Sequence, residues 1–227
     1  YYWKKAKKVA AMSQADRQKM LEIEPGLDVD IVPNGVDVDY FNKTVVSKRE
    51  NGTILFVGNF NWLQNREAVE ILVNQVWPLI KAKLPKVKLW IVGRNPSEKI
   101  KSLANEDIIV SDDLDDIRVA YQKSTLLLAP IFGGGGTRYK ILEAMASGLP
   151  VVTTHIGIEG IGASNGVHAL VSDNISELGK LAVDTISQKS SAQKIAKAAK
   201  KLVDDNFAWT KISSKLEEIY EQTANKK

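Results

Sequence analysis

Short apolar runs rich in β-branched residues alternate along most of this chain with longer stretches of helical periodicity. A run of five or six apolar residues suits a buried strand, whereas apolar residues three and four positions apart suit one face of a helix. Strands joined by helices lie parallel, so the alternation predicts an α/β fold with a doubly wound parallel sheet. Its strands are expected at residues 53–58, 87–93, 107–111, 125–130 and 150–154.

The first helical stretch of this pattern carries an apolar stripe at positions 69, 72, 73, 76 and 80. Pro78 should kink or end that helix, because proline lacks a backbone donor and clashes with the preceding turn. Further helices are expected at 97–104, 115–123, about 137–147, 176–186, 192–207 and 210–222. No strand separates the last three, so C-terminal helices are expected to follow the sheet.

The segment before residue 34 carries two shorter apolar runs, at 7–13 and 29–33, which are also predicted to be strands. Ser13, followed three positions later by Asp16, is typical of a capped helix start, and Pro25 should end that helix. The turn dipeptide Asn34-Gly35 then indicates a hinge or linker.

Composition and charge narrow the possible functions. The 227 residues carry a formal charge of +4, too little to indicate a nucleic-acid partner but suited to an anionic ligand. The absence of cysteine excludes disulfides and thiol chemistry, and two separated histidines argue against a histidine-rich metal site. The apolar run after Lys8 is too short for a signal peptide, so a cytoplasmic protein is expected.

Four consecutive glycines, residues 133–136, stand between a predicted strand and a charged helix. Glycines there let backbone amides approach a phosphate, and a helix N-terminus adds about half a unit of positive charge. Thr137 could cap the helix, and Lys140 and Glu143 project together from the face opposite its apolar residues. A surface loop followed by an ordinary ion pair between these two side chains is the alternative, and spacing alone leaves both open.

Other ligand motifs fit less well. The glycine run lacks the Gly-Lys-Ser/Thr of a P-loop and the acidic residue of a dinucleotide fingerprint, so a kinase or dehydrogenase is disfavoured. Three Asp-x-Asp strings, beginning at Asp28, Asp37 and Asp113, could signal a metal-dependent transferase. They share no sequence context, so no metal site is predicted.

Five segments, in this order, resemble the C-terminal half of retaining family 4 glycosyltransferases of the GT-B fold. They are VPNGVDVDYF, ILFVGNFNW, KLWIVGRNP, GGGGTRYKILEAMASGLPVVTTHIGIEGI and NGVHALVSD. The resemblance implies that residues 34–207 form a Rossmann-like domain that binds a nucleoside diphosphate sugar of UDP or GDP type, with no further cofactor. Residues 1–33 would be the tail of an N-terminal acceptor domain with the hinge, and residues 208–227 a helix that crosses back to it.

The same resemblance implies roles for individual residues. Glu143 matches the second glutamate of the family's Glu-x7-Glu motif and would hold the donor ribose, whereas Gly135 replaces the first glutamate. Asn59 replaces an arginine that binds the diphosphate, which leaves Arg138 and Lys140 for that role. The catalytic set is therefore Lys140, Glu143 and Arg138. The donor-binding set is Gly58, Asn59, Gly93, Val110, Ser111, Asp112, Gly133, Gly134, Gly135, Gly136 and Thr137, with residues 110–112 near the base.

The implied reaction transfers a sugar from the nucleotide sugar to a hydroxyl of a saccharide or lipid-linked acceptor, as in the synthesis of cell-envelope polysaccharide. This chain would supply the donor-binding half, and this part alone is expected to be inactive. Two alternatives stay open: a non-catalytic nucleotide-sugar-binding module and a sugar epimerase of the same fold.

Three further side-chain predictions concern the surface and the crevice. Lys194, Lys197 and Lys201 share one helical face, for which solvation is the default and contact with an anionic membrane the alternative. His155 could line the crevice but is expected to be structural. Trp62 could meet a ligand, yet an aromatic residue beside a helix start is expected to be a packing anchor.

Overall fold

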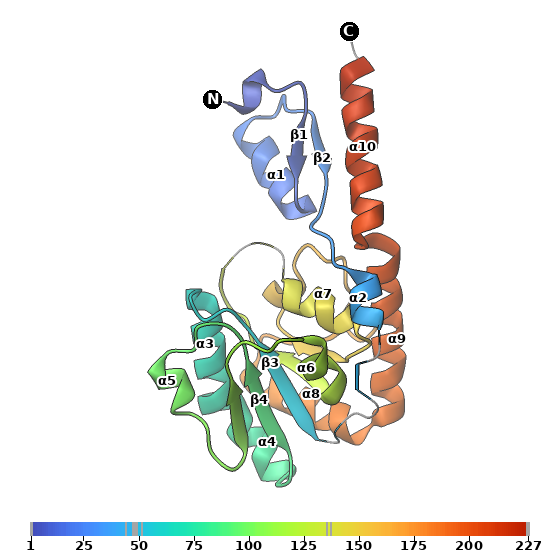
Figure 1. Cartoon of the computed structure of the whole chain (residues 1–227). Coiled ribbons are helices and arrows are strands. Elements are labelled where there is room, and N and C mark those ends of the chain that lie inside the picture. The colour runs from blue at the N-terminus through green and yellow to red at the C-terminus, as the bar shows by residue number, and fades with distance from the viewer. Residues whose placement is uncertain are drawn as a thin grey trace.

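The computed structural model describes residues 2–43, 45–46, 50, 52–134, 136 and 138–225. Its first elements form a small unit separate from the main sheet (Figure 1). This unit comprises η1 (Trp3–Lys5), β1 (Val9–Ala11), α1 (Gln14–Ile23) and β2 (Val29–Ile31), and its two strands pair in parallel. The predicted cap of α1 is confirmed, because Ser13 Oγ accepts a hydrogen bond of 3.0 Å from the Asp16 amide.

The main sheet has six parallel strands in the order β5-β4-β3-β6-β7-β8, which confirms the predicted fold class. They are β3 (Thr53–Val57), β4 (Lys88–Val92), β5 (Ile108–Ser111), β6 (Leu126–Ala129), β7 (Val151–Thr153) and β8 (Leu170–Val171). From β3 the chain adds β4 and β5 on one side, and it then adds β6, β7 and β8 on the other side of β3. Ligands of such sheets bind where this reversal occurs, here between the carboxyl ends of β3 and β6.

Helices cover both faces of this sheet (Figure 1). For that reason the central strand β6 is buried along its whole length and reads as an unbroken apolar run. The remaining elements are α2 (Val38–Asn42), α3 (Leu63–Ile71), the π-helical turn η2 (Leu72–Val76), α4 (Trp77–Lys83), α5 (Glu98–Lys101), α6 (Arg118–Lys123), α7 (Tyr139–Ala146), η3 (Ile156–Ile158), α8 (Ile175–Ser187), α9 (Lys189–Asn206) and α10 (Trp209–Asn225).

Pro78 does not end its helix. The helical path runs from α3 through the wide turn η2 into α4, and the Trp77 amide donates to the Leu72 carbonyl, five residues back. A π turn loosens the backbone directly before the proline, so the ring is accommodated where a regular α-helix would clash. The helix consequently reaches Lys83, and its apolar stripe packs on the sheet as predicted.

Two chain segments meet where the N-terminal unit joins the part that contains the main sheet: one between β2 and α2, and one between α9 and α10. The Val36 amide donates a hydrogen bond of 2.7 Å to the Phe207 carbonyl, and the Trp209 amide donates one of 3.4 Å to the Val36 carbonyl. Neither residue of the Asn34-Gly35 dipeptide has a positive φ, so no tight turn forms there. Gly35 is needed for space instead, because a Cβ at this position would lie 2.7 Å from the Trp209 ring.

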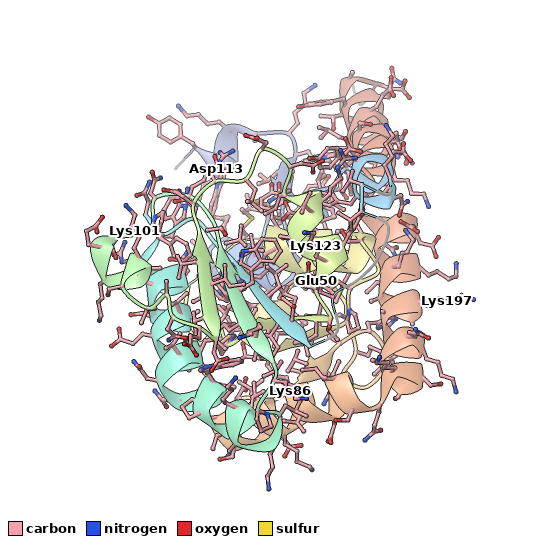
Figure 2. The ribbon with its side chains drawn as sticks, turned by 60° about the horizontal axis from the view of Figure 1, so that its bottom comes forward. Glu50, Lys86, Lys101, Asp113, Lys123 and Lys197 are labelled. Carbon is pink, nitrogen blue, oxygen red and sulfur yellow. The ribbon has the colours of Figure 1, made fainter. Side chains whose placement is uncertain are left out.

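Beyond this crossing α10 extends away from the main sheet (Figure 1). No helix in the described part of the chain combines the length and the apolar character that spanning a membrane requires. The side chains of Lys194, Lys197 and Lys201 are exposed on α9, and Lys197 projects away from the sheet (Figure 2). This arrangement fits a solvated face.

Candidate functional site

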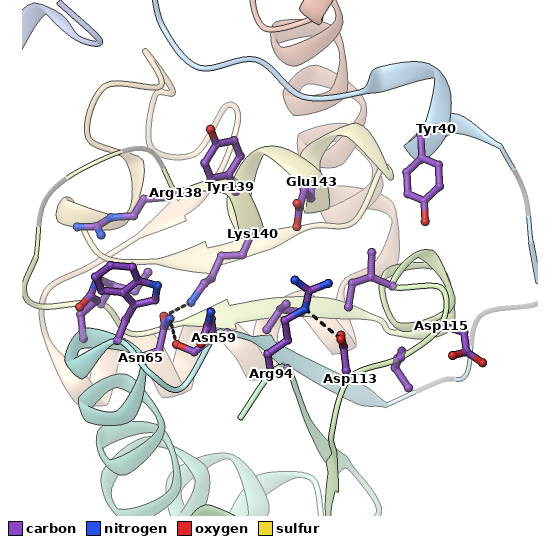
Figure 3. Close-up of a pocket in the computed structure, with 18 residues that line it drawn as sticks. Tyr40, Asn59, Asn65, Arg94, Asp113, Asp115, Arg138, Tyr139, Lys140 and Glu143 are labelled. Atoms are coloured by element: carbon purple, nitrogen blue, oxygen red, sulfur yellow. Dashed lines mark hydrogen bonds and ion pairs between the residues drawn. The ribbon is translucent and has the colours of Figure 1, made fainter. Parts of the chain in front are cut away.

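A pocket of about 770 Å³ opens at the reversal point of the main sheet, beside the carboxyl ends of β3 and β4. Eighteen residues line it, and Figure 3 shows them approaching from both sides. Six were predicted as site residues: Gly58, Asn59, Gly93, Arg138, Lys140 and Glu143. The predicted segments that end β3, end β4 and begin α7 therefore meet in one cavity.

Two glycines bring the backbones after β3 and β4 into close contact at this pocket. The Gly58 amide donates a hydrogen bond of 3.0 Å to the Val92 carbonyl. Gly93 has a φ of +151°, and a Cβ added there would lie only 1.6 Å from the Gly58 carbonyl oxygen. No larger residue fits at position 93 without moving the β3 end, so this part of the pocket wall is bare backbone.

The loop after β3 is held by side chains of α3. Asn65 Nδ2 donates a hydrogen bond of 2.7 Å to the Asn59 carbonyl, and Arg66 Nη1 donates one of 2.8 Å to the Phe60 carbonyl. Trp62 lies at the end of this loop, 61 % exposed, and lines the pocket. The expectation that Trp62 is a packing anchor is therefore wrong, because this N-cap residue of α3 leaves most of its side chain exposed at the pocket.

Lys140 carries the ammonium group inside the pocket. Its Nζ donates a hydrogen bond of 2.6 Å to Asn65 Oδ1 and lies 4.5 Å from the centre of the Phe56 ring (Figure 3). The pKa of Lys140 is lowered to about 7, mainly by burial. The charge of Arg138 also lowers this pKa, and its effect is larger than the opposing effect of Glu143. The amine therefore titrates near neutral pH.

Glu143 stands one helical turn from Lys140 on the same face of α7. Its Oε2 accepts a hydrogen bond of 2.6 Å from the Tyr121 hydroxyl. Burial raises the pKa of Glu143, while the bond from Tyr121 and the charge of Lys140 oppose that rise. Lys140 and Glu143 turn to different partners and form no ion pair with each other. The alternative of an ordinary surface pair is thereby excluded.

Arg138 occupies the N-cap position of α7 and is only 7 % exposed. Its Nη2 donates hydrogen bonds to the carbonyls of Gly134, at 2.6 Å, and Gly133, at 3.4 Å. Burial lowers the pKa of this guanidinium. Arg138 therefore holds the glycine loop against the start of α7 as well as lining the pocket.

The other predicted donor-binding residues that the structure describes do not line this pocket. Val110 and Ser111 belong to β5, where Ser111 Oγ accepts a hydrogen bond of 2.9 Å from Trp90 Nε1. The pocket wall passes instead through Asp113, immediately after the exposed Asp112. Gly133 and Gly134 accept hydrogen bonds from Arg138, which lines the pocket. Gly136 lines a second cavity of about 60 Å³. Gly135 and Thr137 lie outside the described residues.

Sequence reasoning missed a cluster at the far end of the pocket. Tyr40 on α2 lines it, with its hydroxyl donating a hydrogen bond of 3.0 Å to Asp116 and its ring 4.1 Å from the Arg118 guanidinium. Hydrogen bonds from Arg118 lower the pKa of Asp116 to about 2. The residue pattern gives no signal for Tyr40, because α2, which follows the predicted hinge at Asn34-Gly35, has only five residues.

A second missed feature is an ion pair at the pocket rim. Arg94 Nε donates a hydrogen bond of 3.0 Å to Asp113 Oδ2, joining the segments that follow β4 and β5 (Figure 3). Arg94 directly follows Gly93 at the carboxyl end of a predicted strand, and this position could have identified it as a candidate site residue. The pocket therefore holds cations from both halves of the sheet.

The remaining candidates lie outside the pocket. His155 Nδ1 lies 2.9 Å from Asp173 Oδ2 on the surface, and His168 Nδ1 accepts a hydrogen bond from the Ser164 amide within its loop. Both histidines thus have structural partners. Among the described residues no group of three histidine, aspartate or glutamate side chains is arranged to hold a metal ion.

Comparison with known proteins identifies relatives of this chain. A phosphatidyl-myo-inositol mannosyltransferase of Mycolicibacterium smegmatis is 28 % identical over 164 residues, which cover 69 % of this chain and 41 % of that protein. The chain spans less than half the length of these curated relatives.

Solved structures show the same fold. A glycosyltransferase from Rickettsia africae superposes with a TM-score of 0.79 at 23 % identity, covering 97 % of this chain and 64 % of the other. Anabaena Alr3699/HepE, solved with UDP and glucose, superposes with a TM-score of 0.74 at 18 % identity, covering 95 % and 63 %. Because these proteins have the GT-B fold, of which this chain matches a part, the chain has the architecture of the C-terminal half of that fold.

A family model also matches the sequence itself. The match covers residues 51–205, which is more than half of the chain and includes β3 to β8, the glycine loop and the whole of α7. On this match the chain belongs to the glycosyl transferases group 1 family.

Proposed function

We propose that this chain is the donor-binding half of a retaining glycosyltransferase, which moves a sugar from a nucleoside diphosphate sugar of UDP or GDP type to an acceptor hydroxyl. The observation that carries the proposal is the position of Lys140. Its Nζ lies inside the pocket at the reversal point of the sheet, beside the bare backbone of Gly58 and the start of α7. A diphosphate fits such a combination of cation, close backbone and helix N-terminus.

Leaving-group stabilisation is the chemistry that these groups supply. Negative charge builds up on the diphosphate as the glycosidic bond breaks, and preorganised donors stabilise that charge by a few kcal/mol each, about 3 for one well-placed donor. Lys140 and the first amides of α7 would serve as these donors. Arg138 would act by fixing the glycine loop, because its guanidinium already binds the Gly133 and Gly134 carbonyls.

The rest of the donor would occupy the pocket on either side of Lys140. Glu143 would accept hydrogen bonds from the ribose hydroxyls, and the base would lie toward the segment from Val110 to Asp115. The sugar would lie toward the glycine loop, where Gly135 replaces a family glutamate. The UDP in the structurally similar Anabaena protein supports a nucleotide donor for this chain.

The acceptor and the surroundings of the protein are further parts of the proposal. A saccharide or lipid-linked acceptor would bind across the cleft from the glycine loop, on an N-terminal domain of which residues 1–33 form the tail, and α10 would cross back to that domain. The lipid named for the mycobacterial relative supports an envelope acceptor. We propose a cytoplasmic protein; the lysines of α9 fit a solvated face, and they are also the surface that a peripheral membrane contact would use.

Calorimetric titration of the chain with UDP, GDP, ADP, UDP-glucose and GDP-mannose tests the proposal. Binding of one nucleoside diphosphate and its sugar conjugate is the expected result, and failure of all five to bind overturns it. Sugar transfer that appears only when the chain is joined to an acceptor domain would distinguish the enzyme from a non-catalytic binding module. Asn59 in the pocket, in place of an arginine, is the observation that favours the module.

A further inference from the structure

Tyr121 is completely buried, yet it ends in a polar hydroxyl group. It lies on α6, and its ring meets the Phe41 ring edge-on, with the ring centres 5.7 Å apart. A phenylalanine would fill the same space and would need no hydrogen-bond partner. The tyrosine hydroxyl therefore calls for an explanation beyond packing.

That hydroxyl reaches one side chain of the pocket. Tyr121 Oη donates a hydrogen bond of 2.6 Å to Glu143 Oε2, a length typical of a bond to an ionised carboxylate. Glu143 lines the pocket, and Figure 3 shows its carboxylate directed into it. Within the described part of the chain no other hydrogen bond to this carboxylate is found, so Oε1 is available to a ligand.

We propose that Tyr121 is a positioning residue for the donor ribose. Its hydroxyl fixes the orientation of Glu143 and engages Oε2, which leaves Oε1 to accept hydrogen bonds from the vicinal hydroxyls of a ribonucleotide. The inference rests on the proposed function, because it requires a nucleotide whose ribose meets Glu143. It adds that the site should bind ribonucleotides more tightly than deoxyribonucleotides, because the oriented Glu143 carboxylate accepts a hydrogen bond from the 2′-hydroxyl.

The same bond favours the ionised form of the carboxylate. Burial raises the pKa of Glu143, and the hydrogen bond from Tyr121 opposes the rise. Only the ionised group has two accepting oxygens, so loss of the bond should weaken ribose binding most on the acid side of neutrality. A merely structural role for Tyr121 predicts no such change with pH.

The test compares Tyr121→Phe with the unchanged chain. Calorimetry gives the dissociation constants for a ribonucleoside diphosphate and its 2′-deoxy counterpart, UDP with dUDP or GDP with dGDP. A site that hydrogen-bonds a hydroxyl rejects the analogue that lacks it, so the unchanged chain should prefer the ribonucleotide by about tenfold or more. Tyr121→Phe should reduce this ratio at least about threefold, since RT ln 3 is a typical hydrogen-bond contribution.

A pH series with a nucleoside diphosphate sugar supplies the second readout. Tyr121→Phe should lose affinity on the acid side at a higher pH than the unchanged chain does. In a Glu143→Ala background, Tyr121→Phe should have no further effect on the ribose preference, because it acts only through that carboxylate.

Thr185→Val is the matched control. Thr185 on α8 is buried, and its hydroxyl donates a hydrogen bond of equal length, 2.6 Å, to the Leu181 carbonyl away from the pocket. It should lower the melting temperature as Tyr121→Phe does and leave the ribose preference unchanged. If the unchanged chain prefers the ribonucleotide and Tyr121→Phe alters neither the ratio nor the pH profile, the inference is overturned while the proposed function stands. If the unchanged chain binds no nucleotide, both fail.

Discussion

Lys140 on α7 and Asn65 on α3 meet across the reversal point of the sheet, with 2.6 Å between Nζ and Oδ1. Asn65 also donates to the Asn59 carbonyl, so one amide side chain connects Lys140 to the loop after β3. An arginine is expected in this loop by family resemblance, and here the loop supplies neutral hydrogen-bonding groups instead. Lys140 is thus aimed at the pocket by a partner that does not neutralise its charge.

Replacing Lys140 should affect the diphosphate selectively. We expect Lys140→Ala to weaken binding of UDP or GDP by about 10- to 100-fold, since hydrogen bonds to charged groups contribute about 1.5–3 kcal/mol. Binding of the corresponding nucleoside should change little, because its base and ribose do not need this cation. Parallel titrations measure both, and an equal loss for nucleoside and diphosphate would contradict the role given to Lys140.

Donor affinity should fall as the pH rises above neutrality. The pKa of Lys140 is lowered to about 7, so the amine is mostly charged below that pH and mostly neutral above it. A bound diphosphate favours the charged form, and binding must therefore take up a proton at pH 8. Affinity should decrease by up to about tenfold per pH unit, the limit set by one proton.

A nucleoside diphosphate sugar is the suitable ligand for this measurement, because its phosphates do not titrate in the range. Calorimetry in buffers of different ionisation enthalpy measures the proton uptake directly. Lys140→Met should abolish both the uptake and the decline in affinity, and a decline that persists in this variant would assign the titration to another group.

The side chain at position 65, which accepts the hydrogen bond from Lys140, should determine the pKa of that lysine. Asn65→Asp places a carboxylate beside Nζ, which raises the pKa of Lys140 and moves the decline in affinity to higher pH. The added negative charge should also weaken diphosphate binding at every pH. Asn65→Ala should weaken binding without raising the pKa, so the two variants together separate positioning from charge. Identical pH profiles for both would refute the assignment.

Arg138 should stabilise the glycine loop. Arg138 Nη2 makes both bonds, to the Gly133 and Gly134 carbonyls, and the ammonium group of a lysine stands one bond closer to its own backbone, so it should not reach both carbonyls in this geometry. We expect Arg138→Lys to increase amide hydrogen exchange in a peptide spanning residues 131–138 and to weaken donor binding about tenfold, the effect of one lost charged hydrogen bond. Peptides from α9 serve as the internal reference, and unchanged exchange at the loop would show that Arg138 acts on the ligand alone.

Gly93→Ala should strongly destabilise the protein. Its Cβ would lie 1.6 Å from the Gly58 carbonyl oxygen, so the end of β3 must move. Gly162→Ala is the matched control, because Gly162 also has a positive φ, +69°, but an added Cβ meets nothing within 4 Å. The control should lower the unfolding free energy by about 1 kcal/mol. Gly93→Ala should lower it by several times as much, and urea denaturation compares the two.

The sequence predicted the architecture well because its signals are local. Each strand from β3 to β7 is an apolar run, and the Ser13 cap depends on residues three positions apart. The strand β8 and the helix α2 were missed because two and five residues are too few to establish a period. The π turn before Pro78 was missed for another reason. A proline in a helical pattern indicates that the regular hydrogen bonding is interrupted, but it does not indicate whether the helix ends, kinks or widens into a π turn.

The site was predicted less completely, since its contacts join distant segments. The spacing of Lys140 and Glu143 placed both on one face of α7, but their partners Asn65 and Tyr121 lie 75 and 22 residues away. Arg138 was expected to be a phosphate cation, and its bonds to the glycine loop depend on the conformation of that loop. Such pairings follow from the topology of the sheet rather than from any sequence period.

The paired crossing at Val36 and Phe207 has a mechanical consequence. Two chain segments linked by a pair of backbone hydrogen bonds, of 2.7 and 3.4 Å, should resist stretching and sliding more than rotation about the line that joins them. We therefore expect the β1–α1–β2 unit to move most easily by rotation about this crossing, a motion that would change the distance between Ser13 and Gly160, which line the second cavity together. A substitution in either crossing, such as one at Gly35 that pushes on Trp209, should change how far that rotation can go without touching the pocket.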